Sequence, residues 1–159
     1  MWGKNMLKRI VEILDVPEIK IYGFSKKSND KSMAKDINEL SVKFYSIIKE
    51  KPTIPFFILS KNYNVKTKDF DLFIGSICEN NTFEQYIISE GKYAKITIKP
   101  KFGFLWGLSI GETKRYFYTK WLKSSKYKAL NMEYEYHTEK SISKKPTIDI
   151  IFSISDNMK

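Results

Sequence analysis

Acidic and aromatic residues alternate in the segment 131–137, which reads NMEYEYH. In a strand, successive side chains point to opposite faces, so Glu133 and Glu135 would share one face while Tyr134 and Tyr136 occupy the other. Acidic side chains are seldom buried without a partner, so one interpretation is a strand face exposed to solvent. A buried carboxylate at this place would instead be a candidate for a functional site.

Other residue types with chemical potential are sparse. His137 lies near Glu139, but no serine has the surroundings of a nucleophile elbow, so a Ser-His-acid hydrolase is not expected. With one histidine and one cysteine, Cys78, the chain lacks ligands for a typical zinc site. No glycine pattern fits a phosphate loop or a dinucleotide fingerprint. We therefore expect no metal, no cofactor and no catalytic residue, and we favour a protein that is not an enzyme.

The formal net charge is +10, which raises the question of nucleic-acid binding. Only two of the 28 basic residues, Arg9 and Arg115, are arginines, whereas readout of base edges favours arginine, so we do not expect nucleic-acid binding. One dense cluster comprises Lys114, Arg115, Lys120, Lys123, Lys126 and Lys128. Its simplest interpretation is a solvated helix face, and the alternative is a patch for an acidic protein or a nucleic acid.

The sequence gives no sign of export or of a membrane. It has no apolar run of the roughly 18 residues that a membrane span needs, and its first 15 residues lack the features of a signal peptide. A lone cysteine cannot form an internal disulfide. A cytoplasmic location is the resulting expectation.

Hydrophobic periodicity predicts an α+β protein. We expect an amphipathic N-terminal helix at 1–15 and one domain at 16–159. Within that domain, helices are expected at 32–48 and around 110–122, and strands at 18–25, 56–60, 70–78, 83–89, 92–99, 131–137 and 147–154. The order strand-helix-strand-strand occurs at 18–78 and again at 92–154. Two such pseudo-symmetric halves would form a mainly antiparallel sheet with a central cleft at their junction.

Three segments resemble the GyrI-like, AraC-type effector-binding domains. The segment "KYAKITIKP" after the Glu90–Gly91 turn is similar to the strand that precedes the second helix of that family. The segment "YFYTKWLKSSKY", 116–127, is similar to the end of that helix, and "NMEYEYH" with "PTIDIIFSI" resembles the last two strands. Two differences stand out: no helix-turn-helix precedes the domain, which implies a stand-alone module, and the loop 100–107 carries Phe102, Phe104 and Trp106.

The resemblance implies a central cavity lined by aromatic side chains and closed by an acid. Aligning the family on Tyr136 and His137 places its acid at Tyr134, and a shift of one residue places it at Glu135, which we favour. The full set of expected ligand-binding residues is Glu135, Glu133, Tyr134, Trp106, Phe44 and Tyr22. For Trp106 and Phe44, ordinary packing in the core or a lid is the competing interpretation.

Three functions follow from the resemblance. The first is a stand-alone module that binds a bulky hydrophobic or cationic aromatic molecule, as a sensor or by sequestration, with a role in transcription or multidrug response. The second is a hydrolase in which a glutamate and a neighbouring tyrosine activate water in the same cavity. The third is an inhibitor or partner of a DNA-handling enzyme such as gyrase, acting through the basic helix around Lys114 to Lys128.

Overall fold

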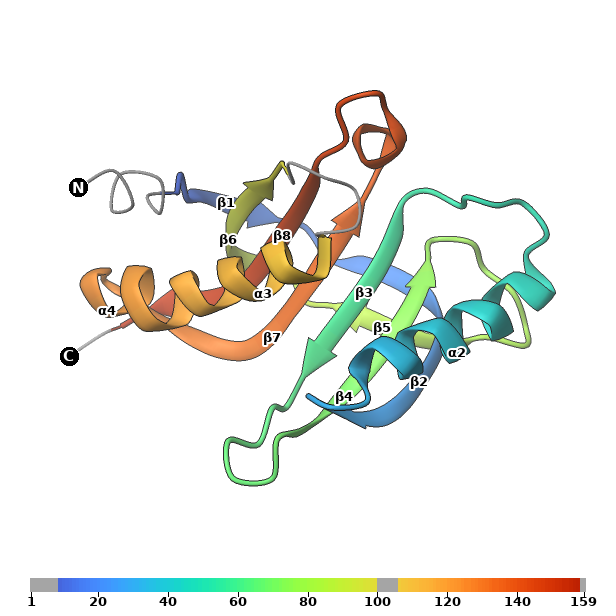
Figure 1. The fold of residues 1–159 in the computed structure, drawn as a ribbon, viewed down its shortest axis with the longest axis horizontal. Helices are drawn as coiled ribbons and strands as arrows, with labels where there is room; N and C mark the ends of the chain where they lie inside the picture. Colours follow the sequence, from blue (N-terminus) through green and yellow to red (C-terminus); the bar gives the residue numbers. More distant parts are fainter. Residues whose placement is uncertain (1–8, 100–105, 158–159) are drawn as a thin grey trace.

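The computed structural model describes residues 9–99 and 106–157 (Figure 1). The strands are β1 (Glu12–Val16), β2 (Ile19–Asn29), β3 (Phe56–Lys61), β4 (Asp69–Ser76), β5 (Glu84–Ile88), β6 (Gly91–Ile98), β7 (Tyr127–His137) and β8 (Ile148–Asp156). The helices are α2 (Met33–Ile47), α3 (Trp106–Tyr116) and α4 (Leu122–Ser124), with a π-helical turn at Phe117–Trp121 and a 3₁₀ turn at Glu139–Ile142. The predicted α+β class is confirmed.

All the strands belong to one sheet in the order β1-β6-β8-β7-β3-β4-β2-β5, and every neighbouring pair is antiparallel. The predicted repeat is confirmed as β2-α2-β3-β4 and β6-α3-β7-β8. Each unit forms three adjacent strands of the sheet, and the two units meet where β3 pairs with β7. The junction of the halves is therefore a continuous pair of hydrogen-bonded strands.

The strand that precedes each half pairs with the other half. β1 pairs with β6 of the second half, and β5 pairs with β2 of the first half. The amphipathic helix expected at 1–15 is thus wrong for 12–15, which belong to β1, while residues 1–8 lie outside the described part. The open edge of β6 supplies unpaired backbone groups, and pairing with them overrides the helical spacing of the apolar residues.

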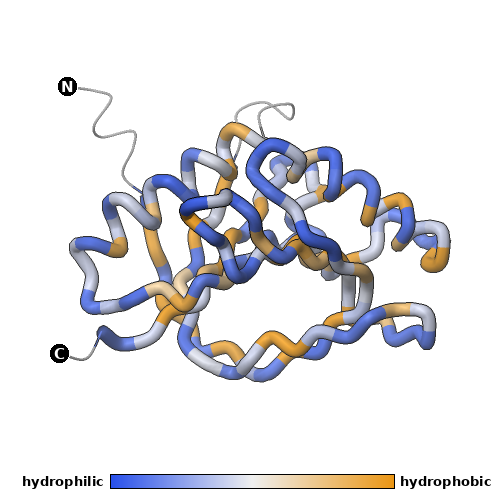
Figure 2. The backbone as a smooth tube through the Cα atoms, turned by 90° about the horizontal axis from the view of Figure 1, so that it is seen from below, coloured by the Kyte–Doolittle hydropathy of each residue, from blue (hydrophilic) through white to orange (hydrophobic). Residues whose placement is uncertain are grey.

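Helices α2 and α3 lie on the same face of the sheet, and the strands curl away on the other side (Figures 1 and 2). Under α2, the core contains Leu40 and Phe44 of the helix together with Phe24, Phe70, Leu72, Ile74 and Phe83. Under α3, the core is built around Phe117 and the isoleucines of β6 and β8. Within the described ranges, no helix is long and apolar enough to cross a membrane.

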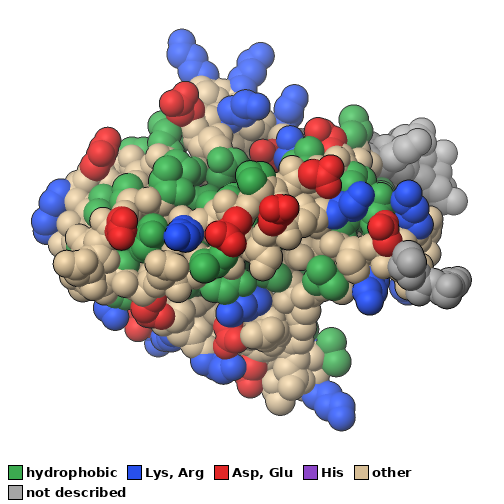
Figure 3. Space-filling view, turned by 180° about the vertical axis from the view of Figure 1, so that it is seen from behind, with side chains coloured by type: hydrophobic (Ala, Val, Ile, Leu, Met, Phe, Trp, Pro, Cys, Tyr) green, Lys and Arg blue, Asp and Glu red, His purple; other side chains and the backbone are tan. Residues whose placement is uncertain are grey.

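The helix-free face carries a third core. Its buried members come from both halves and are Ile21, Phe57, Leu59, Phe73, Ile88, Tyr93, Tyr134 and Ile151. No helix of the described ranges covers them, so the curl of the sheet must bring the strands together to exclude water. In the view from behind, hydrophobic side chains run across the middle of this face among scattered charges (Figure 3).

Two paired glycines allow close backbone approach where β2 passes from one partner to the next. Gly23 faces Glu84 of β5 on one side and Gly75 of β4 on the other. A Cβ atom on Gly23 would overlap the carbonyl oxygen of Ile74, and one on Gly75 would overlap that of Tyr22. A side chain at either position would therefore force β2 and β4 apart.

We expect Gly23→Ala to lower the free energy of unfolding by about 1–3 kcal/mol, because the added methyl group has backbone atoms in its place. Gly111→Ala is the matched control, since Gly111 lies in α3 with nothing within 4 Å of the added Cβ. That variant should gain up to about 1 kcal/mol from helix propensity. Urea unfolding of both variants measures the difference, and equal stability would contradict the close approach.

Candidate functional site

The helix side of the paired strands β3 and β7 is called the central seam here. α2 packs mainly on β2 and β4, and α3 packs on β6, so the strand pair at the middle lies between the two helices (Figure 1). On β3, the seam residues are Phe56, Ile58 and Ser60. Facing them on β7 are His137, Glu135 and Glu133, in that order. On this side of the sheet, the β3 strand of the seam is therefore mainly apolar and the β7 strand is acidic.

Glu135 is a buried carboxylate, with 6% of the residue exposed. Its neighbours on the adjacent strands are Ile58 of β3 and Ile150 of β8. Its Oε1 atom lies 3.2 Å from Nε2 of His137. Glu135 thus does not belong to a solvent-exposed strand face, and a carboxylate in such apolar surroundings requires positive charge or hydrogen-bond donors nearby.

Glu133 is bound by two side chains from the helix above it. Tyr118 donates its hydroxyl hydrogen to Oε1 over 2.6 Å, and Lys114 lies with Nζ 2.7 Å from Oε2. Burial raises the pKa of Tyr118, and the charge of Glu133 raises it further. Burial alone would lower the pKa of Lys114, but the charges of Glu133, Glu135 and Asp30 and the hydrogen bond to Glu133 outweigh it, so that pKa is raised.

Two backbone irregularities bracket these contacts. The π-helical turn at Phe117–Trp121 follows α3 directly and contains Tyr118, and its Phe117 ring stacks on Phe152 at 3.8 Å between centroids. On β7, the pairing with β8 is irregular between Ala129 and Glu133, and Asn131 adopts a φ of 56°. π-Helical turns and β-bulges are enriched near functional sites because they redirect side chains.

An aromatic group lies on the other side of the seam. Tyr45 of α2 stacks on Phe56 with 5.9 Å between ring centroids, and Phe44 meets Phe56 edge-on at 5.4 Å. Lys51 already places its ammonium 5.3 Å from the Tyr45 ring centre. The exposed parts of Tyr45 and Phe56 are therefore suited to contact with apolar or cationic groups.

The structure brings together only part of the predicted site. Glu133 and Glu135 lie at the seam, but Tyr134 is buried in the helix-free core with Tyr93, on the opposite face of the sheet. Phe44 is fully buried under α2, and Tyr22 is a half-buried residue of the same core. Trp106 begins α3, but its side chain lies outside the described part of the structure, as do Phe102 and Phe104.

Sequence reasoning missed three seam residues. The sequence places Lys114 in the basic cluster and presents His137 only as a catalytic candidate, and it gives Tyr118 no role beyond membership of the helix around 110–122. Lys114 and Tyr118 are four residues apart, a spacing that places both side chains on the same side of a helix. That spacing is the sequence signal that both could contact one acidic residue.

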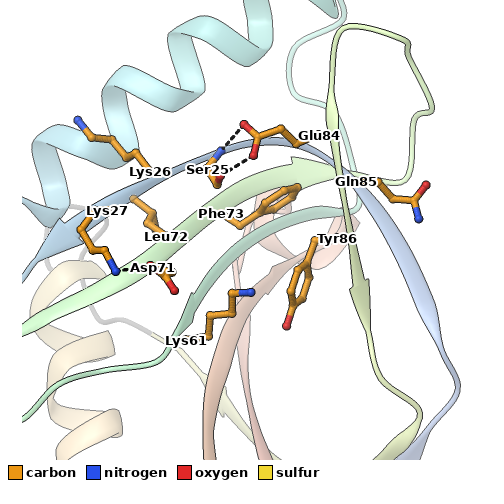
Figure 4. Close-up of a pocket in the computed structure, with 10 residues that line it drawn as sticks. All are labelled: Ser25, Lys26, Lys27, Lys61, Asp71, Leu72, Phe73, Glu84, Gln85 and Tyr86. Atoms are coloured by element: carbon orange, nitrogen blue, oxygen red, sulfur yellow. Dashed lines mark hydrogen bonds and ion pairs between the residues drawn. The ribbon is translucent and has the colours of Figure 1, made fainter.

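A separate hollow of about 380 Å³ lies on the helix-free side between β2, β4 and β5 (Figure 4). Its charged groups are mostly paired: Lys27 contacts Asp71 at 2.8 Å, and Ser25 donates to Glu84. Lys61 lies 4.4 Å from the ring centre of Tyr86, and Figure 4 shows the two side chains directed toward each other. Because these groups already satisfy one another, we place the candidate site at the central seam.

The basic cluster is divided by the fold. Lys114 contacts Glu133 at the seam, whereas Lys123, Lys126 and Lys128 line a shallow hollow of about 530 Å³ where α4 meets β7. The surface patch is therefore smaller than the sequence indicates, and it lies apart from the seam.

Removing the Tyr118 hydroxyl tests the hydrogen bond at Glu133. We expect Tyr118→Phe to lower the free energy of unfolding by about 1–2 kcal/mol, because a partly buried carboxylate loses a donor. Tyr116→Phe is the matched control, since the Tyr116 hydroxyl has no hydrogen bond within the described ranges. Urea unfolding compares the two variants, and an equal loss in both would contradict a specific role for Tyr118.

The GyrI-like small molecule binding domain matches residues 10–147 of the chain. Among solved structures, an integron cassette protein from Vibrio cholerae has a TM-score of 0.66 at 18% identity, covering 91% of this chain and 95% of that one. SAV2435 bound to tetraphenylphosphonium has a TM-score of 0.68 at 10% identity, with 92% and 94% covered.

The C-terminal domain of EcmrR has a TM-score of 0.61 at 15% identity, covering 93% of this chain and 98% of that one. No curated protein matches the sequence significantly. These structural similarities show that the chain has the same fold as those proteins. The match over residues 10–147 identifies its family. The chain belongs to the GyrI-like small molecule binding domain family.

Proposed function

We propose that the protein binds a bulky hydrophobic or cationic aromatic molecule at the central seam, with Glu135 as the counter-charge. The observation that carries this proposal is the burial of Glu135 between Ile58 and Ile150. Among the described residues, the two carboxylates Glu133 and Glu135 lie close together at the seam, with one lysine, Lys114, and the imidazole of His137 beside them. In a protein of net charge +10, this local concentration of acid favours a cation.

The side chains on both sides of the seam support the same ligand class. Phe56, Ile58 and Tyr45 offer apolar and aromatic surface, which gains free energy when a ligand removes it from water. Opposite them, Glu135 offers charge. A relative with this fold has been solved with tetraphenylphosphonium, a bulky aromatic cation, which makes that molecule a rational probe. A role as a sensor or by sequestration stays part of this proposal.

The hydrolase alternative needs a carboxylate that can accept a proton from water. Both oxygens of Glu133 are occupied by Tyr118 and Lys114, so Glu133 is poorly placed for that task. Glu135 is the remaining candidate. Loss of a reactive ligand over time, absent in Glu135→Gln, would separate hydrolysis from simple binding.

The test compares tetraphenylphosphonium with the neutral triphenylphosphine oxide by thermal shift and by direct titration. At 100 times its Kd, a ligand should stabilise the protein by about 2.7 kcal/mol. Glu135→Gln should weaken binding of the cation by at least about tenfold, because the buried counter-charge is lost. Binding of the neutral compound should change little.

Glu139→Gln is the matched control, since Glu139 is exposed on the 3₁₀ turn after β7 and carries the same charge. It should leave both affinities unchanged. If neither compound binds the wild-type protein, or if Glu135→Gln and Glu139→Gln bind the cation equally well, the proposed site is wrong.

A further inference from the structure

Lys114 places a positive charge of the protein's own beside the acidic residues of the seam. Its Nζ atom lies 2.7 Å from Oε2 of Glu133, and its side chain is 22% exposed. Its pKa is raised by Glu133 and Glu135 against the opposing effect of burial, so the side chain is an ammonium ion in contact with the acidic wall. The ligand-free protein thus contains its own cation at the seam.

Glu133 and Glu135 have different contacts, and these contacts determine which charged groups an entering ligand would encounter. Tyr118 and Lys114 engage the two oxygens of Glu133, and both come from the same helical segment. Glu135 contacts His137 through one oxygen, and its charge also acts on Lys114. An entering cation therefore meets a pair of carboxylates that already share one ammonium.

Lys114 is suited to give way. Its ammonium is held at the end of a flexible four-carbon chain, and the exposed fraction of the side chain provides a route to water. An arginine at this place would bind Glu133 through two parallel hydrogen bonds and be harder to displace. The chemistry of the side chain is that of an exchangeable counter-ion.

We propose that Lys114 is a built-in competitor that sets the charge specificity of the seam. A cationic ligand binds by displacing the ammonium of Lys114 from Glu133, whereas a neutral aromatic ligand binds without that exchange. The affinity for cations is consequently lower than the two carboxylates alone would give, and the seam accepts neutral ligands as well. This inference rests on the proposed function, because it assumes that ligands bind at the seam.

The experiment measures the affinity of Lys114→Met and Lys114→Arg for tetraphenylphosphonium and for triphenylphosphine oxide. Loss of the competing charge in Lys114→Met should raise the affinity for the cation about tenfold. The more firmly held guanidinium of Lys114→Arg should lower it by about threefold or more. Affinity for the neutral probe should stay within about twofold in both variants, since no charge exchange is involved.

Lys27→Met is the matched control. Lys27 contacts Asp71 at 2.8 Å on the helix-free side, so its loss changes the net charge equally but leaves the seam intact. It should bind the cation like the wild type. Lys114→Met/Glu133→Gln removes both partners and should return the cation affinity toward the wild-type value, as expected when two residues are coupled.

The outcomes separate the two proposals. If Lys114→Met and Lys114→Arg both bind the cation as the wild type does, while Glu135→Gln loses it, Lys114 is no competitor but the seam still binds cations. If no variant binds either probe, the proposed function fails and this inference with it. If Lys114→Met does not fold, as judged by urea unfolding, the reduced affinity expected of Lys114→Arg remains a direct test.

Discussion

The pairing of β3 with β7 is the contact on which both the fold and the site depend. Each half contributes three adjacent strands and one helix, and the halves are joined by the backbone hydrogen bonds of this strand pair. The exchange of β1 and β5 then ties each half to the edge of the other. With both helices placed over the outer strands, the middle of the sheet is left for Glu133, Glu135 and their partners.

Burying carboxylates at such a junction has a cost that the surrounding residues must offset. Glu133 is stabilised by a hydroxyl and an ammonium, and Glu135 by a neighbouring imidazole. Replacing charged groups by apolar ones in such positions often leaves stability equal or higher, so stability alone does not explain why acids lie there. The proposed recognition of a positive charge would account for both the acids and the lysine beside them.

The order of elements was predictable because local patterns are strong where one face is buried. The apolar spacing along 33–47 defines α2, and the alternation along β7 correctly separates Glu135 from Tyr134. Which face of β7 lies toward the helices depends on tertiary packing, so Tyr134 was wrongly grouped with the acids. β1 was missed because its apolar residues also fit a helix, although the strand 83–89 before the second half implied an equivalent strand before the first.

Pseudo-symmetry places equivalent strands beside each other at the seam, but their side chains differ. Ile58 of β3 is the cross-strand neighbour of Glu135 of β7, and Ser60 is that of Glu133. The first half therefore supplies uncharged, mainly apolar side chains, and the second half supplies charge. Two strands with identical side chains would have given either an apolar surface or an acidic one. Because the two strands differ, one surface presents apolar side chains beside negative charge, with the ammonium of Lys114 next to that charge.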